Sequence, residues 1–171
     1  MTTASTGPVR AWAWSDSPPT LALLDQTLLP AEEVWLQVRT VDALVDAIVR
    51  LVVRGAPLLG ACGAFGVALA VAQGQAEGWD AARLGSEIDR VRDARPTAVN
   101  LAWGVDRVRP LVQRGLATVV AGARALASED EAANRELSRL GADWILAHTD
   151  REQVRVVTHC NSGALAPTGW G

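Results

Sequence analysis

Two arginines lie just ahead of prolines that are expected to begin helices, and this arrangement is suited to binding an anion. Arg54 precedes Pro57 by three residues, and Arg95 directly precedes Pro96. A cation at a helix N-terminus is unfavourable by about 0.3–1 kcal/mol, because the helix dipole is positive there. A phosphate held between each guanidinium and the free backbone N–H groups would remove that penalty, and Gly55 would allow its close approach. The alternative is that each arginine faces water or pairs with a nearby carboxylate, for which the candidates are Asp93 and Asp106.

A second candidate site surrounds Cys160, within the segment THCNSGA at residues 158–164. The β-branched run before it, at residues 154–158, predicts a strand that leads through a turn into a helix start. Ligands of open α/β sheets bind at the carboxyl ends of strands, and a helix N-terminus lowers the pKa of a thiol. Cys160 is therefore a candidate nucleophile or proton-transfer group. The alternative is a cysteine that only packs in a core, as we expect for Cys62.

The composition excludes several other kinds of chemistry. All sixteen basic residues are arginine, so Schiff-base catalysis and a phosphate-binding loop with a lysine are excluded. The two cysteines and two histidines do not have the spacing of a zinc site, and we expect no metal. A net charge of −3 argues against a nucleic-acid partner held by counterion release.

The elements that must position these residues follow from hydrophobic periodicity. Short runs at residues 9–14, 20–25 and 33–39, separated by prolines and polar turns, predict a small antiparallel sheet. After Thr40 the period changes to 3.6, which predicts successive helices. The first helix is expected to end at Gly55, and the second to begin at Pro57. A third is expected from its cap at Asp80 to about Arg92, and a fourth from Thr97 to about Gly115. Ser128 and Glu131 have the spacing of a capping box, which predicts the start of a last long helix.

The longest apolar stretch, at residues 57–72, predicts a tightly packed core helix. It has 16 residues and is rich in glycine and alanine, whereas a membrane span needs about 20 residues. We therefore expect no membrane partner. The polar N-terminus lacks the apolar core of a signal peptide, which predicts a cytoplasmic protein.

These patterns predict an α/β fold in two parts. Residues 1–150 are expected to form a small N-terminal antiparallel sheet and a helical bundle. Residues 151–171 are expected to be the first strand and turn of a parallel α/β sheet. A parallel strand needs neighbours, so we expect residues 154–171 either to be mobile or to pair with another chain.

Several segments together resemble the N-terminal half of methylthioribose-1-phosphate isomerase, within the broader initiation factor 2B-like superfamily. The resemblance covers essentially the whole chain, in order and in spacing. The segments that carry it are RGAP at 54–57, ARPTAVNL at 94–101, THCNSGALA at 158–166, LDQTLLP at 24–30 and residues 134–142.

The resemblance implies a cytoplasmic aldose–ketose isomerase of methionine salvage. Such an enzyme converts 5-methylthioribose 1-phosphate to 5-methylthioribulose 1-phosphate without cofactor or metal. It implies that Arg54, Gly55, Ala56 and Arg95 bind this sugar phosphate, chiefly through its phosphate, and that Cys160 is catalytic.

The resemblance also implies that residues 151–171 are the truncated start of a Rossmann-like catalytic domain. Members of the family continue into that domain, which supplies a catalytic aspartate. One member of an acid–base pair would then be missing, so we expect little or no activity from this chain alone. The implied protein partner is a second copy, as in a homo-oligomer, or a separate C-terminal half.

Two relatives within the superfamily offer alternative functions. A regulatory module like the alpha, beta and delta subunits of the translation initiation exchange factor would not need the site residues. Ribose-1,5-bisphosphate isomerase would act on a related sugar phosphate. The presence of Arg54, Arg95 and Cys160 favours an enzyme, and the forms RGAP and THCN favour the methylthio sugar.

Overall fold

Three short strands form the first layer of the computed structural model, which describes residues 10–159 and 162–171. β1 (Trp12–Asp16), β2 (Pro19–Leu24) and β3 (Trp35–Val38) form an antiparallel sheet in the order β1-β2-β3. The predicted sheet is confirmed, although β1 is shifted toward the turn relative to the expected run at 9–14, of which residue 9 lies outside the described residues. The shift arises because Ser15 and Asp16 pair with Thr20 and Pro19 across the hairpin.

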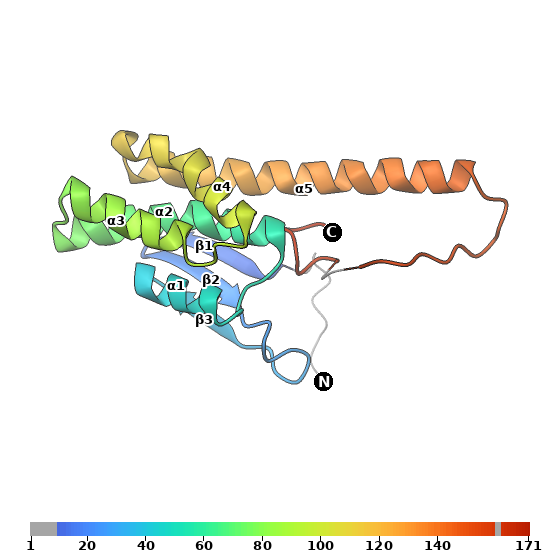
Figure 1. The fold of residues 1–171 in the computed structure, drawn as a ribbon, viewed down its shortest axis with the longest axis horizontal. Coiled ribbons are helices and arrows are strands. Elements are labelled where there is room, and N and C mark those ends of the chain that lie inside the picture. The colour runs from blue at the N-terminus through green and yellow to red at the C-terminus, as the bar shows by residue number, and fades with distance from the viewer. Residues whose placement is uncertain (1–9, 160–161) are drawn as a thin grey trace.

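Helices make up most of the remaining described chain (Figure 1). They are α1 (Val41–Val49), α2 (Ala56–Glu77), α3 (Ala81–Arg92), α4 (Val99–Val108), the 3-10 helix η1 (Arg109–Arg114) and α5 (Leu116–Ala147). The predicted cap of α3 is confirmed, since a carboxylate oxygen of Asp80 accepts a hydrogen bond of 2.7 Å from the N–H of Arg83. Thr40 caps α1 in the same way, with its hydroxyl accepting from Ala43 at 3.2 Å.

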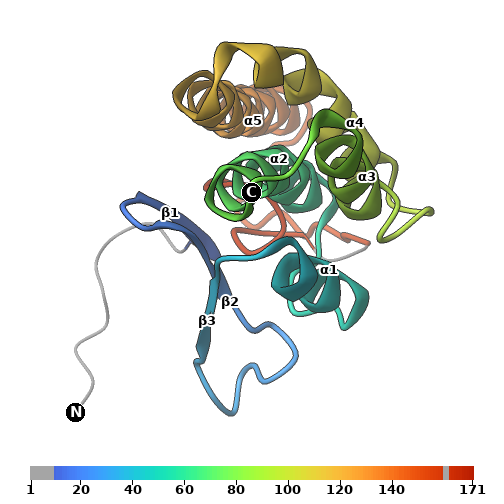
Figure 2. The same cartoon turned by 90° about the vertical axis from the view of Figure 1, so that its left-hand side faces the viewer.

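α2 is the central helix, and the sheet and the other helices lie around it (Figure 2). Its length and mean hydropathy of 1.6 would suit a membrane span, but 78% of that apolar window is buried inside the described fold. Phe65 is fully buried, with its ring centroid 5.1 Å from that of Trp12 and 5.0 Å from that of Trp14. The helix is therefore the core of the protein, as the sequence predicts.

Two helices end earlier than predicted, each for a local backbone reason. α1 ends before the expected stop at Gly55, because Leu51 turns the chain with a φ of 65°. α4 ends before the expected stop near Gly115, because Pro110 supplies no N–H for an α-helical hydrogen bond and the chain tightens into η1.

α5 contradicts the predicted helix start at Ser128. It is one helix of 32 residues, and Ser128 lies in its interior. The buried face of its first half packs against α2, so tertiary packing overrides the local capping signal. Glu131, the expected partner in the capping box, instead pairs with Arg10 at 2.8 Å and with Arg135 at 2.9 Å.

Glycines bring the backbones of α2 and α4 into direct contact. A Cβ atom on Gly104 of α4 would lie only 1.9 Å from the carbonyl oxygen of Gly60 on α2. A Cβ atom on Gly63 would lie 2.5 Å from the carbonyl oxygen of Leu101. Because these contacts fall close to the first turn of both helices, the crossing sets the N-termini of α2 and α4 side by side.

The expected strand at residues 154–158 is not formed, and that part of the prediction is wrong. Residues 153–159 adopt neither helix nor strand, and the side chains of Val156 and Val157 are 70% and 98% exposed. A strand needs hydrogen-bonding neighbours, and no other described residue pairs with this segment.

The end of the chain returns to the fold rather than staying free of it. Residues 166–169 are buried. The hydroxyl of Thr168 donates to the carbonyl of Ala127 at 2.7 Å, and its N–H donates to a carboxylate oxygen of Asp130 at 3.0 Å. The indole N–H of Trp12 donates to the carbonyl of Thr168 at 2.8 Å. This segment is thereby held between β1 and α5.

The glycine contact is testable by adding one methyl group. We expect Gly104→Ala to lower the free energy of unfolding by about 2–3 kcal/mol, because the new Cβ forces α2 and α4 apart. Gly141→Ala is the matched control, since its Cβ would meet nothing within 4 Å in α5. It is expected to raise the free energy of unfolding by about 0.5–1 kcal/mol through helix propensity. Urea unfolding measures both, and equal effects of the two substitutions would contradict the close crossing.

Candidate functional site

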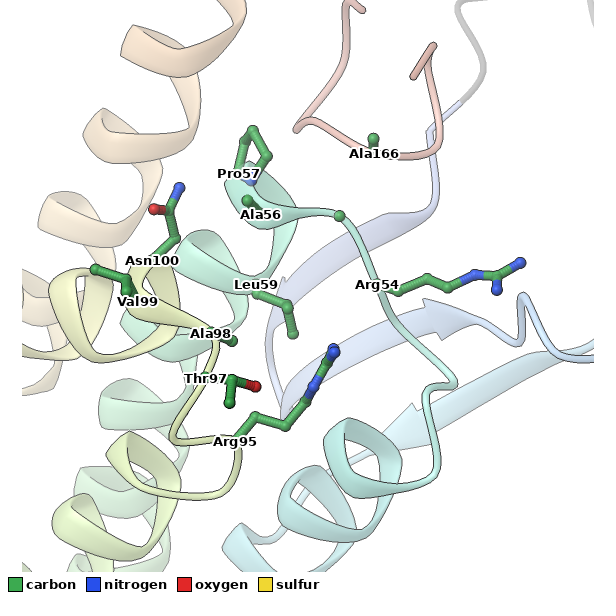
Figure 3. A pocket seen from close by; sticks show the side chains of 11 residues that line it. Arg54, Ala56, Pro57, Leu59, Arg95, Thr97, Ala98, Val99, Asn100 and Ala166 are labelled. Atoms are coloured by element: carbon green, nitrogen blue, oxygen red, sulfur yellow. The ribbon is translucent and has the colours of Figure 1, made fainter. Parts of the chain in front are cut away.

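A cavity of about 600 Å³ lies where the N-termini of α2 and α4 meet (Figure 3). It contains all four residues that the sequence analysis assigned to substrate binding, namely Arg54, Gly55, Ala56 and Arg95. The remaining lining residues are Pro57, Leu59, Thr97, Ala98, Val99, Asn100 and Ala166. Residues from three separate parts of the sequence, at 54–59, 95–100 and 166, thus share one cavity.

The loop that carries Arg54 is fixed by the two residues before it. Val52 and Val53 are each only 1% exposed, so they anchor the loop in the core. The carbonyl of Val52 also accepts a hydrogen bond of 2.9 Å from the N–H of Gln26. Arg54 follows this anchored pair and is exposed.

The first turn of α2 requires glycine at position 55. Gly55 has a φ of 105°, and a Cβ there would lie 2.4 Å from the carbonyl oxygen of Ala166. That carbonyl accepts a hydrogen bond of 3.1 Å from the N–H of Leu58. The N–H of Ala56, by contrast, forms no hydrogen bond with any described residue, and it remains available to a ligand.

The first turn of α4 supplies a second set of donors. Within residues 10–159 and 162–171, the N–H groups of Val99 and Asn100 have no hydrogen-bond partner. The N-cap residue of α4 is Ala98, whose side chain has no polar group that could accept a hydrogen bond from these N–H groups. Both helix N-termini therefore present unpaired N–H groups and positive dipole ends to the same cavity.

Arg95 lies in this cavity without a carboxylate partner in the described part of the chain. The two carboxylates that could have neutralised it are engaged by Arg92, at 2.9 Å for Asp106 and 3.0 Å for Asp93. The hydrogen bonds from Arg92 lower the pKa of Asp106. The alternative in which Arg95 pairs with one of these carboxylates is therefore not what the structure shows.

The two arginines differ in how their side chains lie. Arg95 is half-buried and extends toward the segment that carries Arg54 (Figure 3). Arg54 extends away from Ala56 and Pro57 in the same view, and it has no ion pair with the described residues. The structure thus shows Arg54 in the alternative arrangement, in which this arginine faces water.

Neither cysteine adds an observed group to the cavity. Cys160, the predicted catalytic residue, lies outside the described residues. Cys62 is 1% exposed in α2, and burial raises its thiol pKa to about 12. A thiol with that pKa is protonated at neutral pH and serves as a small apolar side chain, as the sequence predicts.

Sequence reasoning missed the other lining residues. Thr97, Ala98 and Asn100 belong to the same segment as Arg95, and their place at a predicted helix start was the available signal. Ala166 carried no comparable signal, because only the folded chain brings it to Gly55.

The cavity combines cationic and apolar walls, which suits a small anion attached to a partly apolar molecule. Two guanidinium groups and two helix N-termini can neutralise a phosphate. Leu59 and Val99 supply apolar surface beside them. Within the described ranges, no group of three or more His, Cys, Asp or Glu side chains is arranged to hold a metal ion.

Comparison with known proteins connects this cavity to one family. The chain is 43% identical over 164 residues to a methylthioribose-1-phosphate isomerase from Anaeromyxobacter sp. (strain K), covering 96% of this chain and 46% of that protein. It is 43% identical over 159 residues to a probable bifunctional methylthioribose-1-phosphate isomerase/methylthioribulose-1-phosphate dehydratase from Nocardia farcinica, covering 92% of this chain and 28% of that protein. The chain thus spans less than half the length of these relatives.

Solved structures share the same fold. A 5-methylthioribose 1-phosphate isomerase from Pyrococcus horikoshii matches with a TM-score of 0.77 and 28% identity, over 98% of this chain and 47% of that one. The delta subunit of translation initiation factor eIF-2B from A. fulgidus matches with a TM-score of 0.76 and 36% identity, over 95% of this chain and 48% of that one. The family model described as the Initiation factor 2 subunit family matches residues 52–168, and the chain belongs to that family.

Proposed function

We propose that this chain contributes the phosphate-binding part of a methylthioribose-1-phosphate isomerase. The proposed reaction converts the aldose 5-methylthioribose 1-phosphate to the ketose 5-methylthioribulose 1-phosphate in methionine salvage. The observation that carries the proposal is the cavity lined by Arg54, Arg95 and the first turns of α2 and α4. Relatives at 43% identity bear the name of this enzyme, which supports the same substrate class.

The substrate phosphate is proposed to lie between the two arginines. The N–H groups of Ala56 and Val99 would donate to its oxygens, and the absence of a side chain at Gly55 lets the phosphate approach the backbone. The dipoles of α2 and α4 add favourable electrostatic energy at the same point. The phosphate would then be the counterion of the two arginines, which no described carboxylate provides.

Catalysis is proposed to depend on Cys160, from the resemblance of its segment to the family. The isomerisation removes one hydrogen from C2 of the sugar and adds one at C1, so it needs a group that moves a proton or stabilises the shifted hydrogen. A cavity that excludes water would protect either route. No metal or cofactor is part of the proposed mechanism.

The proposed setting is the cytoplasm, with the work shared between this chain and further protein. The curated relatives are more than twice as long as the matched region, so the proposal requires residues corresponding to the rest of their length. A C-terminal half, in the same polypeptide or in a separate one, would supply them. Residues 151–171 are proposed to lead into that catalytic domain, where the segment at 154–158 would find strands to pair with.

A regulatory role is the second candidate function. It is favoured by the 36% identity to the eIF-2B delta subunit, a protein named for translation initiation. A purely regulatory module has no need for two unpaired arginines at a cavity lined by helix N-termini. Phosphate binding at this cavity therefore discriminates between the two candidates.

Phosphate affinity tests the proposed role of the arginines. We expect Arg95→Gln to weaken binding of inorganic phosphate and of methylthioribose 1-phosphate by tenfold or more, because a charge-assisted hydrogen bond contributes about 1.5–3 kcal/mol. Arg114→Gln is the matched control, since Arg114 is an exposed arginine that lines no described cavity with Arg95. Isothermal titration calorimetry measures the affinity of each variant for both ligands. Equal affinity in the two variants would contradict the assignment.

Turnover tests the requirement for additional residues. The purified 171-residue chain is expected to bind the sugar phosphate but to isomerise it at least about 10²-fold more slowly than a full-length relative, because the second proton-transfer group is proposed to lie outside these 171 residues. A coupled assay for the ketose product measures the rate. Rapid turnover that is abolished by Cys160→Ser would show that this chain is sufficient, against the proposal.

A further inference from the structure

Gln26 is a buried polar residue that connects two walls of the cavity without lining it. It lies in the loop between β2 and β3 and is 3% exposed. Its backbone N–H donates to the carbonyl of Val52 at 2.9 Å. Its side-chain amide donates to the carbonyl of Leu165 at 3.2 Å, across 139 positions of sequence.

The two carbonyls belong to segments that each deliver a cavity residue. Val52 lies two residues before Arg54, and Leu165 directly precedes Ala166. One residue therefore holds the arginine-bearing loop with its backbone and the C-terminal segment with its side chain. A buried amide is costly unless it is hydrogen-bonded, so the bond to Leu165 also favours one position of that segment.

The loop around Gln26 is itself rigidly held. The N–H of Asp25 donates to the carbonyl of Val34 at 2.8 Å. A carboxylate oxygen of Asp25 accepts from the N–H of Thr27 at 2.9 Å and from its hydroxyl at 2.6 Å. Asp25 is only 7% exposed, so these bonds are shielded from water. Gln26 thus projects from a fixed base.

The segment that Gln26 holds lies directly against the first turn of α2. The carbonyl of Ala166 accepts from Leu58 at 3.1 Å, beside the Cβ-free backbone of Gly55. If Leu165 moved away from Gln26, Ala166 would withdraw from the first turn of α2. The cavity would then lose one wall while Arg54 and Arg95 stayed in place.

We propose that Gln26 is a positioning residue for the proposed phosphate site. Gln26 sets the distance between the loop that carries Arg54 and the segment that carries Ala166. Ala166 follows the predicted catalytic residue, Cys160, by six positions. The expected effect of Gln26 on phosphate binding rests on the proposed function. The coupling of the two cavity walls through Gln26 does not, and it can be measured separately.

The test replaces the amide of Gln26 and keeps its volume. Gln26→Met removes the donor to Leu165 and retains the backbone bond to Val52. Gln26→Leu, which also has no group that can donate to the Leu165 carbonyl, is the second variant. Gln113→Met is the matched control, because it makes the same substitution at an exposed glutamine of η1 that does not line the cavity. Hydrogen exchange and phosphate titration are measured for all of them in the intact chain.

Both Gln26 variants are expected to speed exchange of the Leu58 and Ala166 amides about fivefold, the equivalent of one hydrogen bond, and to weaken phosphate binding by a similar factor. Gln113→Met is expected to change neither the exchange rates nor the phosphate affinity, and the Leu69 amide in the core of α2 is expected to be unaffected in every variant.

Three results would overturn the inference. The first is unchanged exchange at Leu58 and Ala166 in both Gln26 variants. The second is equal acceleration at Leu69, which would show general destabilisation. The third is faster local exchange with unchanged phosphate affinity. If the parent chain binds no phosphate, the proposed function fails, and the exchange result still decides whether Gln26 couples the two walls.

Discussion

The backbone contact between α2 and α4 is the constraint on which the rest of the site depends. Gly60 and Gly104 let two helices meet at a separation that any side chain would prevent. Because the contact lies near the first turns, it fixes where both helices begin. The loops that precede them, carrying Arg54 and Arg95, are brought to one cavity as a consequence.

This crossing creates an electrostatic problem that an anion solves. Two helix N-termini and the guanidinium of Arg95 place positive charge at one cavity, whose lining also includes Arg54, and the two carboxylates expected as partners of Arg95 are bound to Arg92. Repulsion among like charges disfavours the arrangement in a protein that binds nothing there. In the proposed function, a phosphorylated sugar would supply the missing negative charge, and its less polar end would lie against the apolar side of the cavity.

Local signals in the sequence were sufficient for the parts of the fold that local chemistry decides. The three strands and the cap at Asp80 depend on neighbouring residues, and both were predicted. The capping signal at Ser128 was misleading, because burial of the first half of α5 against α2 stabilises a helix through that point. The expected strand at 154–158 fails for the opposite reason, since β-branched residues form a strand only beside a partner.

In the candidate site, too, the residues marked by local sequence patterns were predicted and the long-range contacts were not. Arg54 and Arg95 could be predicted from the sequence, because a cation just before a helix start is unfavourable and this pattern is local. The close approach of Gly55 to Ala166, and the hydrogen bonds of Gln26, join residues that are far apart in the chain, so no local sequence pattern predicts them.

The most direct test of the account is the amide spectrum of the isotopically labelled chain during titration with inorganic phosphate. The account predicts that Ala56, Val99 and Asn100 shift together with one saturation curve. Shifts at the exposed arginines 151 and 155, with none at these three amides, would contradict it.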